Sequence, residues 1–287
     1  MRKVTLAVAA LAALAGSLAL APEAQAQARQ WQTVRIATEG AYAPWNFTVA
    51  GGRLDGFEID LANDLCRRMN VRCEVIAQDW DGIIPALVAG KYDAIMAGMN
   101  ITDRRLETIN FSRPYAGGPH GFATLKSSPL ARVAGAGTIV PMGEAAASRA
   151  AIDALRTALR GRTIGVQVST TNANFVNEFF KDVATIREYK TTEEHDLDLI
   201  NGRVDAIYAA HTALVATMEN AQFRDMTLVG PGFRGGLLGR GVAVGLRKTD
   251  PELQALFDKA ITEALADGTI SRLSVKWFKT DIAAPQS

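Results

Sequence analysis

Arg105 is the charged residue best placed to bind a small anionic ligand. We expect Thr102 to cap a short helix, so that Arg105 falls in its first turn. The helix dipole disfavours a cation there by up to ~1 kcal/mol, unless the guanidinium holds an anion beside the free backbone N–H groups. A guanidinium binds a carboxylate through two hydrogen bonds and would orient an amino-acid-like ligand. The alternative is an exposed arginine whose charge is balanced by Asp103 and Glu107.

Hydroxyl side chains follow a second expected strand in the same way. Ser169, Thr170 and Thr171 come directly after the strand expected at 163–168 and begin a helix. They would supply the other side of a carboxylate site, or they only cap their own helix.

An acidic residue and two aromatic residues complete the candidate site. Glu39 follows the first expected strand, where it could pair with an ammonium or guanidinium group of a ligand. Tyr42 and Trp80 could form walls against a cation or a planar group. The commoner role of such aromatic side chains is to fill the core.

Patterns of catalytic and metal sites are missing from the sequence. It contains no G-x-S-x-G, no H-E-x-x-H, no Walker loop and no G-x-G-x-x-G after a strand. The spacing of His120, His195 and His211 matches no metal motif. We therefore predict a binding protein without cofactor or metal, and not an enzyme.

The elements that position these residues alternate between strand and helix. This rhythm predicts mostly parallel sheets flanked by helices. Residues 127–144, rich in Gly, Ala, Pro and Ser, are expected to form a surface loop. The strands are expected at 33–38, 73–77, 93–97 and 163–168, and the helices at 57–69, 81–89, 145–159, 174–180, 192–201, 251–267 and 269–278.

An internal repeat predicts two related lobes. The segment Leu87–Ala97 recurs as Leu199–Ala209, and each copy is a helix end, a Gly turn, a basic residue and a strand. Chance recurrence of a common helix-to-strand connection is the alternative. Open α/β sheets bind ligands outside the carboxyl ends of their strands, so two facing lobes would share one cleft.

The N-terminus has the layout of a secretory signal peptide. Arg2 and Lys3 precede an apolar stretch, and small-x-small patterns end at Ala26 and Ala28, where cleavage is expected. An N-terminal membrane anchor is the alternative. Export would place the protein in an oxidising compartment, where Cys66 could form a disulfide with Cys73; two free buried thiols are the other possibility.

Composition excludes several classes of protein. The 287 residues carry 31 Lys and Arg against 30 Asp and Glu, which argues against a nucleic-acid partner. Removal of residues 1–26 leaves 29 of each sign. The hydrophobic share of 48% excludes a disordered chain, and two Cys are too few for a Cys-ligated structural zinc site.

Together these residues resemble a known family along nearly all of the chain after the leader. The sequence is similar to the periplasmic solute-binding proteins of polar amino-acid ABC importers (type II, solute-binding family 3), most of all to the opine-binding branch for octopine and nopaline, near the lysine/arginine/ornithine- and histidine-binding branch. The segments that carry the likeness are Ala37–Phe47, Gly56–Ala62, Thr102–Arg105 and Asp267–Ile270, together with the Cys66/Cys73 pair.

The resemblance implies a two-lobed Venus flytrap fold with a two-strand hinge. Lobe 1 would comprise residues 27–118 and 230–287, and lobe 2 residues 119–229. The protein would be a periplasmic monomer that captures a small zwitterion, an amino acid or an opine, and presents it to an ABC permease of the inner membrane. The Cys66/Cys73 pair matches the disulfide of basic amino-acid members.

The resemblance also implies a role for each site residue. Arg105 would bind the ligand carboxylate, and Glu39 a distal cationic group. Tyr42 and Trp80 would enclose the ligand side chain. The remaining ligand contacts would come from the first-lobe residues Ala97, Gly98 and Asn100 and from the second-lobe residues Gln167, Ser169, Thr170 and Thr171.

Two departures from the family pattern concern the ligand. Ala97-Gly98 stands where many members have Ser-Ser, which removes hydroxyls and widens the cleft. The acid that grips the α-ammonium should lie near Ala210, which is followed by His211. This suits a ligand with a substituted α-nitrogen or with an extra carboxylate near His211, as opines have; alternatively, His211 only packs behind the cleft. His120 is a weaker candidate for a ligand contact.

An enzyme on the same fold is the alternative function. The family includes periplasmic dehydratases that act on cyclohexadienyl acids. Such an enzyme needs a general acid near the leaving hydroxyl, for which Glu39 or His211 would be the candidates.

Overall fold

The structure, a computed structural model, describes residues 31–285. The predicted leader at 1–26 lies outside the described residues. No helix between residues 31 and 285 is long and apolar enough to cross a membrane.

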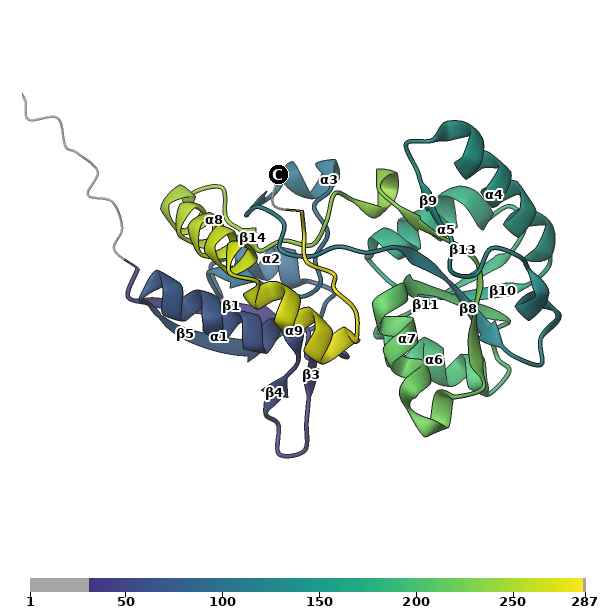
Figure 1. The fold of residues 1–287 in the computed structure, drawn as a ribbon, viewed down its shortest axis with the longest axis horizontal. Coiled ribbons are helices and arrows are strands. Elements are labelled where there is room, and N and C mark those ends of the chain that lie inside the picture. Colours follow the sequence, from purple (N-terminus) through teal and green to yellow (C-terminus); the bar gives the residue numbers. More distant parts are fainter. Residues whose placement is uncertain (1–30, 286–287) are drawn as a thin grey trace, which may run out of the picture. The chain divides into compact units, whose positions relative to one another are not determined.

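The first sheet combines segments from both ends of the described chain (Figure 1). In order across the sheet, its strands are β5 (Arg72–Ala77), β1 (Thr33–Thr38), β6 (Ala94–Ile95), β14 (Gly245–Leu246) and β7 (Asn110–Phe111). β1 is parallel to β5 and β6, whereas β14 is antiparallel to β6 and β7.

Both faces of this sheet are covered. Along β1, Val34 and Ile36 point into one core and Ala37 into the other, as the pleat of a strand requires. The helices of the first core are α1 (Phe57–Met69), α8 (Pro251–Ala266) and α9 (Thr269–Phe278), and those of the second are α2 (Ile83–Val88) and α3 (Asp103–Leu106).

The second sheet is built from the middle of the chain. In order, its strands are β11 (Thr185–Tyr189), β10 (Thr163–Gln167), β12 (Ala206–Ala210), β8 (His120–Leu125), β13 (Met226–Arg234) and β9 (Ile139–Pro141). β10 is parallel to β11 and β12, β8 is antiparallel to β12 and β13, and β9 is parallel to β13. Its helices are α4 (Ala145–Ala158), α5 (Thr171–Phe180), α6 (Thr192–Ile200) and α7 (His211–Glu219).

Two chain segments connect the sheets, which makes the fold two-lobed with a two-strand hinge. The first leads from β7 to β8 and the second from β13 to β14. Ala116 and Val242 form an antiparallel bridge, so the two segments are paired where they cross. A small sheet of β2 (Ala41–Tyr42), β3 (Asn46–Thr48) and β4 (Leu54–Asp55) projects from the first lobe (Figure 1).

Several predicted elements are confirmed. The strand at 33–38 and the helix at 57–69 have the expected bounds. The repeat also recurs in space, because Gly90 and Gly202, both in the left-handed region at φ 77° and 69°, each follow a helix and precede a strand. The predicted Cys66–Cys73 disulfide is present and ties α1 to β5.

Both sheets are mostly parallel, as predicted, and each contains one strand of opposite direction. That strand is β14 in the first sheet and β8 in the second, and each receives the chain directly from the hinge. Such strands enter from the hinge instead of from a crossover helix, so no βαβ pattern marks them in the sequence.

The loop expected at 127–144 also contains regular structure. It includes a 3₁₀ turn at Pro129–Arg132 and the edge strand β9. β9 forms because it pairs with β13, a contact distant in sequence. The lobe boundaries at 118/119 and 229/230 stay predictions; β13 continues past the second one to Arg234.

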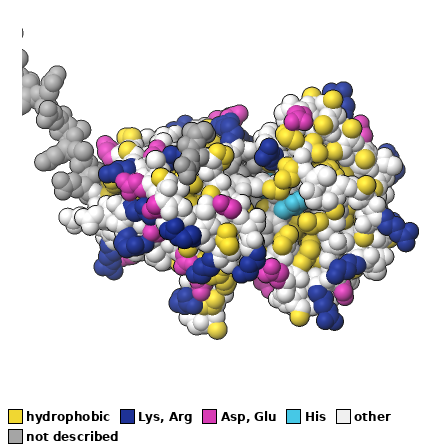
Figure 2. All heavy atoms as spheres, viewed as in Figure 1, with side chains coloured by type: hydrophobic (Ala, Val, Ile, Leu, Met, Phe, Trp, Pro, Cys, Tyr) yellow, Lys and Arg dark blue, Asp and Glu magenta, His cyan; other side chains and the backbone are white. Residues whose placement is uncertain are grey.

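Charged side chains are distributed without separation of sign on the face shown in Figure 2, where Lys and Arg alternate with Asp and Glu. This arrangement agrees with the near balance of charge in the sequence.

Candidate functional site

Most of the predicted ligand-binding residues line one cavity, which we call the binding cavity. They follow the carboxyl ends of β1, β5, β6 and β10, where open α/β sheets bind ligands. The cavity is lined by Glu39, Tyr42, Trp80, Ala97, Gly98, Asn100, Arg105, His120, Gln167, Thr170, Thr171 and Asn172.

Arg105 is positioned by the start of α3. The Thr102 hydroxyl accepts a hydrogen bond from the Arg105 backbone N–H at 3.2 Å, as the sequence predicted. The guanidinium donates to the Asn100 carbonyl at 2.8 Å, and its Cζ lies 5.2 Å from the centre of the Trp80 ring. Burial lowers the pKa of Arg105 to about 10, so the side chain remains charged at neutral pH. Within the described chain it has no ion pair, which leaves its charge available to an anion.

The second lobe contributes the beginning of α5. The Thr170 hydroxyl accepts from the Ala173 N–H at 3.0 Å and donates to the Gln167 carbonyl at 2.7 Å. Thr170 therefore caps its own helix, the alternative that the sequence left open. Thr171 is buried and lines the cavity.

Ser169 does not line the binding cavity. Its hydroxyl bonds to Asp81 Oδ1 at 3.1 Å, and its carbonyl accepts from Trp80 Nε1 at 3.2 Å. Because Ser169 belongs to the second lobe and its two partners to the first, it contributes a direct contact between the lobes.

Glu39 is buried, with 7% of its surface exposed. Its Oε1 accepts from Gln167 Nε2 at 2.6 Å, across the two lobes. Burial, with smaller contributions from the charges of Glu58 and Asp79, raises the pKa of Glu39 to about 7. A cation beside this carboxyl group would favour its ionised form.

The aromatic walls come from Tyr42 and Trp80. The Tyr42 ring is parallel to that of Trp45, with an interplanar angle of 4° and centroids 6.3 Å apart. Burial raises the pKa of Tyr42, so its hydroxyl stays protonated. The Trp80 ring also faces the guanidinium of Arg105.

His211 does not line the binding cavity. Its imidazole packs on the glycines of β8 and β13: a Cβ at Gly121 would lie 2.2 Å from its Nε2, and one at Gly232 would lie 2.6 Å from its Cε1. Burial lowers the pKa of His211, which keeps the ring neutral.

His120, unlike His211, lines the binding cavity. It is buried, and its Nδ1 lies 2.7 Å from Asn172 Oδ1. Burial is the main cause that lowers the pKa of His120 to about 4. Asn172 was not predicted from the sequence. Its position in the first turn of α5, beside Thr171, is the signal that could have identified it.

Glu58, a buried acidic residue behind the cavity, was also not predicted from the sequence. Glu58, at the start of α1, accepts from the Gly98 N–H at 2.7 Å, from Asn46 Nδ2 at 2.6 Å and from the Tyr115 hydroxyl. Asn46 Oδ1 in turn accepts from the Gly40 N–H at 2.8 Å. Glu58 thus holds the two chain segments that carry Glu39 and Gly98.

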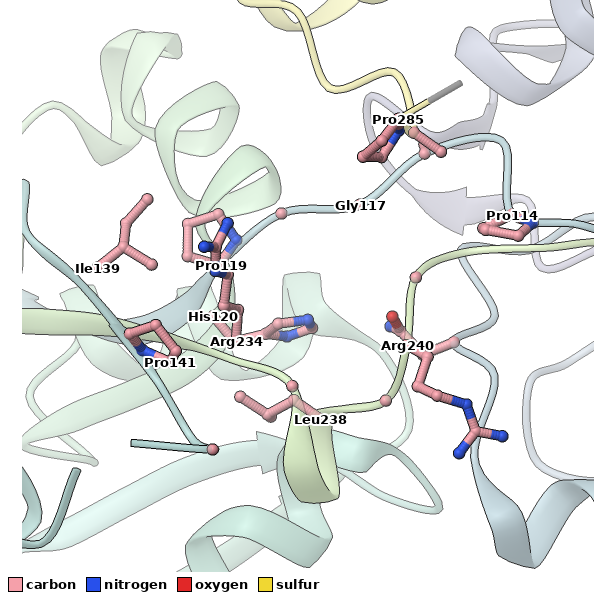
Figure 3. Close-up of a pocket in the computed structure, with 18 of the residues that line it drawn as sticks. Pro114, Gly117, Pro119, His120, Ile139, Pro141, Arg234, Leu238, Arg240 and Pro285 are labelled. Carbon is pink, nitrogen blue, oxygen red and sulfur yellow. The ribbon is translucent and has the colours of Figure 1, made fainter. Parts of the chain in front are cut away.

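A larger cavity lies at the hinge, between the two crossing segments and the chain's last described residues. Figure 3 shows its proline-rich lining, with Arg240 extending away from the other labelled side chains. Arg240 is paired with Asp103 at 2.7 Å. The hinge cavity shares Asn100 and His120 with the binding cavity but lacks its combination of Arg105, Glu39 and aromatic walls.

The described residues contain no cluster of His, Cys, Asp and Glu that could hold a metal ion. The arrangement of the binding cavity is suited to binding: one cation, one acid and two aromatic rings surround a single space.

Comparison with known proteins gives the family. Residues 34–280 match the model of bacterial extracellular solute-binding proteins, family 3. The chain is 48% identical to the octopine-binding periplasmic protein of Rhizobium meliloti, over 89% of this chain and 93% of that one. It is 32% identical to the lysine/arginine/ornithine-binding periplasmic protein of Escherichia coli K12, over 94% and 96% of the two chains.

One solved structure of a periplasmic binding protein has a similar fold. The fold is similar to that of a periplasmic His/Glu/Gln/Arg/opine family-binding protein from Silicibacter pomeroyi in complex with lysine, with a TM-score of 0.71, 34% identity, and coverage of 88% of this chain and 100% of that one. The chain belongs to the bacterial extracellular solute-binding proteins of family 3.

Proposed function

We propose that this protein, the substrate-binding component of an ABC importer, captures an opine or a basic amino acid in the binding cavity. The ligand would carry a carboxylate at one end and a guanidinium or ammonium group at the other. The names of its relatives, which include octopine-binding and lysine/arginine/ornithine-binding proteins, support this ligand class.

The observation that carries the proposal is a pair of unlike charges that do not neutralise each other. Arg105 has no carboxylate partner in the described chain, and the Glu39 carboxyl is bonded to the neutral amide of Gln167. Both line the same cavity. A zwitterion whose side chain lies between Tyr42 and Trp80 would satisfy both charges at once.

Ligand binding would couple the two lobes. Glu39, Trp80 and Arg105 belong to the first lobe, whereas Gln167 and Thr171 belong to the second. A ligand that contacts both sets has more contacts when the lobes are together, so it shifts the population towards that arrangement.

We infer that the protein acts in the periplasm as a monomer and presents its ligand to an inner-membrane permease. Its relatives are periplasmic binding proteins, and the expected leader together with the Cys66–Cys73 disulfide fits an oxidising compartment. Since those relatives are binding proteins, we propose no catalytic role for Glu39 or His211.

A thermal-shift screen of the mature protein against amino acids and opines tests this function. A ligand at 100 times its dissociation constant stabilises the folded state by roughly 2.7 kcal/mol. We expect a rise in melting temperature with octopine, nopaline, arginine, lysine or ornithine. No rise with any of them would refute the proposal, and conversion of prephenate or arogenate by the purified protein would favour the dehydratase instead.

A further inference from the structure

The buried acid Glu58 binds three segments of the first lobe that are distant from one another in sequence. Its Oε1 accepts from the Gly98 N–H at 2.7 Å and from the Tyr115 hydroxyl, and its Oε2 accepts from Asn46 Nδ2 at 2.6 Å. Glu58 has 1% of its surface exposed, and Asn46 and Tyr115 have none. Because water does not reach these groups, a donor that lost its acceptor here would stay unpaired, which is costly.

The orientation of each group in this network is fixed. Asn46 Oδ1 accepts from the Gly40 N–H at 2.8 Å, so the amide nitrogen of Asn46 must face Glu58. Both carboxyl oxygens of Glu58 then face donors, and a proton on either oxygen would find no acceptor among these partners. Burial raises the pKa of Glu58, whereas the three hydrogen bonds lower it. The network is therefore built for a carboxylate that only accepts.

Two of the three bonds lead to the binding cavity. Gly98 lines the cavity and has a φ of 59°, and a Cβ there would lie 2.8 Å from Tyr42 Cε1, so this segment runs close against the aromatic wall. Asn46 holds the residue that follows Glu39 in the chain. A shift of the Glu58 carboxylate would therefore move two walls of the cavity.

The third bond leads to the hinge. Tyr115 lies on the first hinge segment, and its backbone N–H donates to the Val242 carbonyl on the second segment at 2.9 Å. Its own carbonyl accepts from the Ala284 N–H at 3.0 Å. The next residue, Ala116, forms the bridge with Val242 at which the two segments pair. Through the Tyr115 hydroxyl, Glu58 is thus bonded to the place where the hinge segments cross.

We propose that Glu58 is a positioning residue for ligand binding, which holds the cavity walls at Gly98 and beside Glu39 in a fixed place relative to the hinge crossing at Tyr115. Glu58 does not itself line the cavity. Loss of its hydrogen bonds should therefore lower ligand affinity although no ligand contact is removed. This inference rests on the proposed function, because it assumes that the ligand binds in the binding cavity.

An exchange of groups between Glu58 and Asn46 tests the cavity side. Glu58→Gln replaces one acceptor by a donor that faces the Asn46 amide, and Asn46→Asp places two carboxylates against each other. By calorimetry with arginine and with octopine, we expect each single variant to bind at least tenfold more weakly than the wild type. In the double variant the new carboxylate at position 46 accepts from the new amide and from the Gly40 N–H, so affinity should return to within threefold of the wild type.

Tyr115→Phe tests the hinge side, because it removes only the hydroxyl that donates to Glu58. Tyr92→Phe is the matched control: Tyr92 is equally buried in the first lobe, but its hydroxyl donates to the Ile83 carbonyl. Both variants should lose free energy of unfolding in urea, since each loses one buried hydrogen bond. Only Tyr115→Phe should also lose ligand affinity, by threefold to tenfold. A purely structural role of Tyr115 would give equal affinities for the two variants and would overturn the link to the hinge.

The outcomes separate the inference from the proposed function. Melting temperatures without ligand show which variants are folded. If the wild-type protein binds arginine or octopine and the folded single variants at Glu58 and Asn46 bind within twofold of it, the inference is wrong and the proposed function stands. A folded double variant that stays tenfold weaker than the wild type would also refute the inference. If the wild-type protein binds neither opines nor basic amino acids, both are wrong.

Discussion

At the scale of single residues, Arg105 is partly buried and has no acidic partner among residues 31–285. Its guanidinium contacts the Asn100 carbonyl and the face of Trp80, neither of which carries a negative charge. A ligand carboxylate would supply that charge in a place that water reaches poorly, where charged hydrogen bonds are strong.

We therefore predict that Arg105→Ala reduces ligand affinity at least 100-fold while the protein stays folded, since charged hydrogen bonds contribute about 1.5–3 kcal/mol each. Arg104→Ala is the matched control: Arg104 belongs to the same short helix but is exposed. Calorimetry and circular dichroism measure the two properties. Equal affinity of Arg105→Ala and the wild type would rule out this assignment.

Glu39 gives a prediction for pH. Its pKa of about 7 in the protein means that the carboxyl is largely protonated below neutral pH. A ligand with a cationic tail binds the ionised form, so its affinity should fall as pH decreases below about 7, by up to tenfold per pH unit. A ligand with a neutral tail should lack this dependence.

Glu39→Gln is the corresponding variant. It should weaken cationic-tailed ligands much more than neutral-tailed ones and should abolish the pH dependence, because no titrating group remains at that position. Calorimetry from pH 5.5 to 8.5 provides both readouts. Equal losses for both ligand types would contradict the role of Glu39.

At the scale of elements, the helix starts and the disulfide keep the site residues in place. Thr102 caps α3 and Thr170 caps α5, and each cap fixes the turn that carries a cavity residue. The Cys66–Cys73 bond joins α1 to β5, while Glu58 on α1 binds the Gly98 N–H. The same helix therefore supports both the sheet edge and the cavity floor.

Loss of the disulfide should affect stability more than binding. Its loop is short, with a sequence separation of 7, for which loop-closure entropy gives a stabilisation of roughly 2–3 kcal/mol. We expect the double variant Cys66→Ser, Cys73→Ser to lose about this much free energy of unfolding in urea and to keep its ligand affinity within a few fold. A large loss of affinity with unchanged stability would show that the bond shapes the cavity instead.

The elements also differ in how far the sequence predicted them. α1 and β1 were predicted with their bounds because their apolar periodicity is strong and local signals mark their ends. β9 was missed since its Gly-, Ala- and Pro-rich surroundings resemble a loop, and it becomes a strand only through pairing with β13. The one reversed strand of each sheet, β8 or β14, was missed for the same reason, because its direction follows from the hinge crossings.

At the scale of the whole molecule, the lobes are joined by side-chain contacts outside the hinge. Glu39 accepts from Gln167, Trp80 donates to the Ser169 carbonyl, and Trp45 donates to Thr212. Each bond joins a residue of one lobe to a residue of the other, so each favours the arrangement in which a bound ligand would contact both lobes.

Trp80→Phe tests this coupling, because it keeps an aromatic wall but removes the Nε1–H that donates to Ser169. We expect a loss in ligand affinity of threefold to tenfold, equivalent to about 1 kcal/mol for one hydrogen bond. Trp277→Phe is the control, as Trp277 Nε1 donates to Asp60 within the first lobe; it should change stability and leave affinity unchanged. Similar affinities of both variants would mean that the Trp80 bond does not favour binding.

The sequence by itself predicted the two α/β lobes, the disulfide and the cavity residues Glu39, Tyr42, Trp80, Arg105, Thr170 and Thr171, because strand ends, helix caps and their polar side chains are local features. The cavity residues Ala97, Gly98, Asn100 and Gln167 followed only from the resemblance to the family. Only the tertiary structure decided which of these side chains share a space. In the folded protein Ser169 lies at the contact between the lobes, and His211 packs on the glycines of β8 and β13. His120 and Asn172, which are distant in sequence, lie in contact. The physical reason is that a side chain's environment depends on the strand beside its own, and strand order is set by long-range pairing.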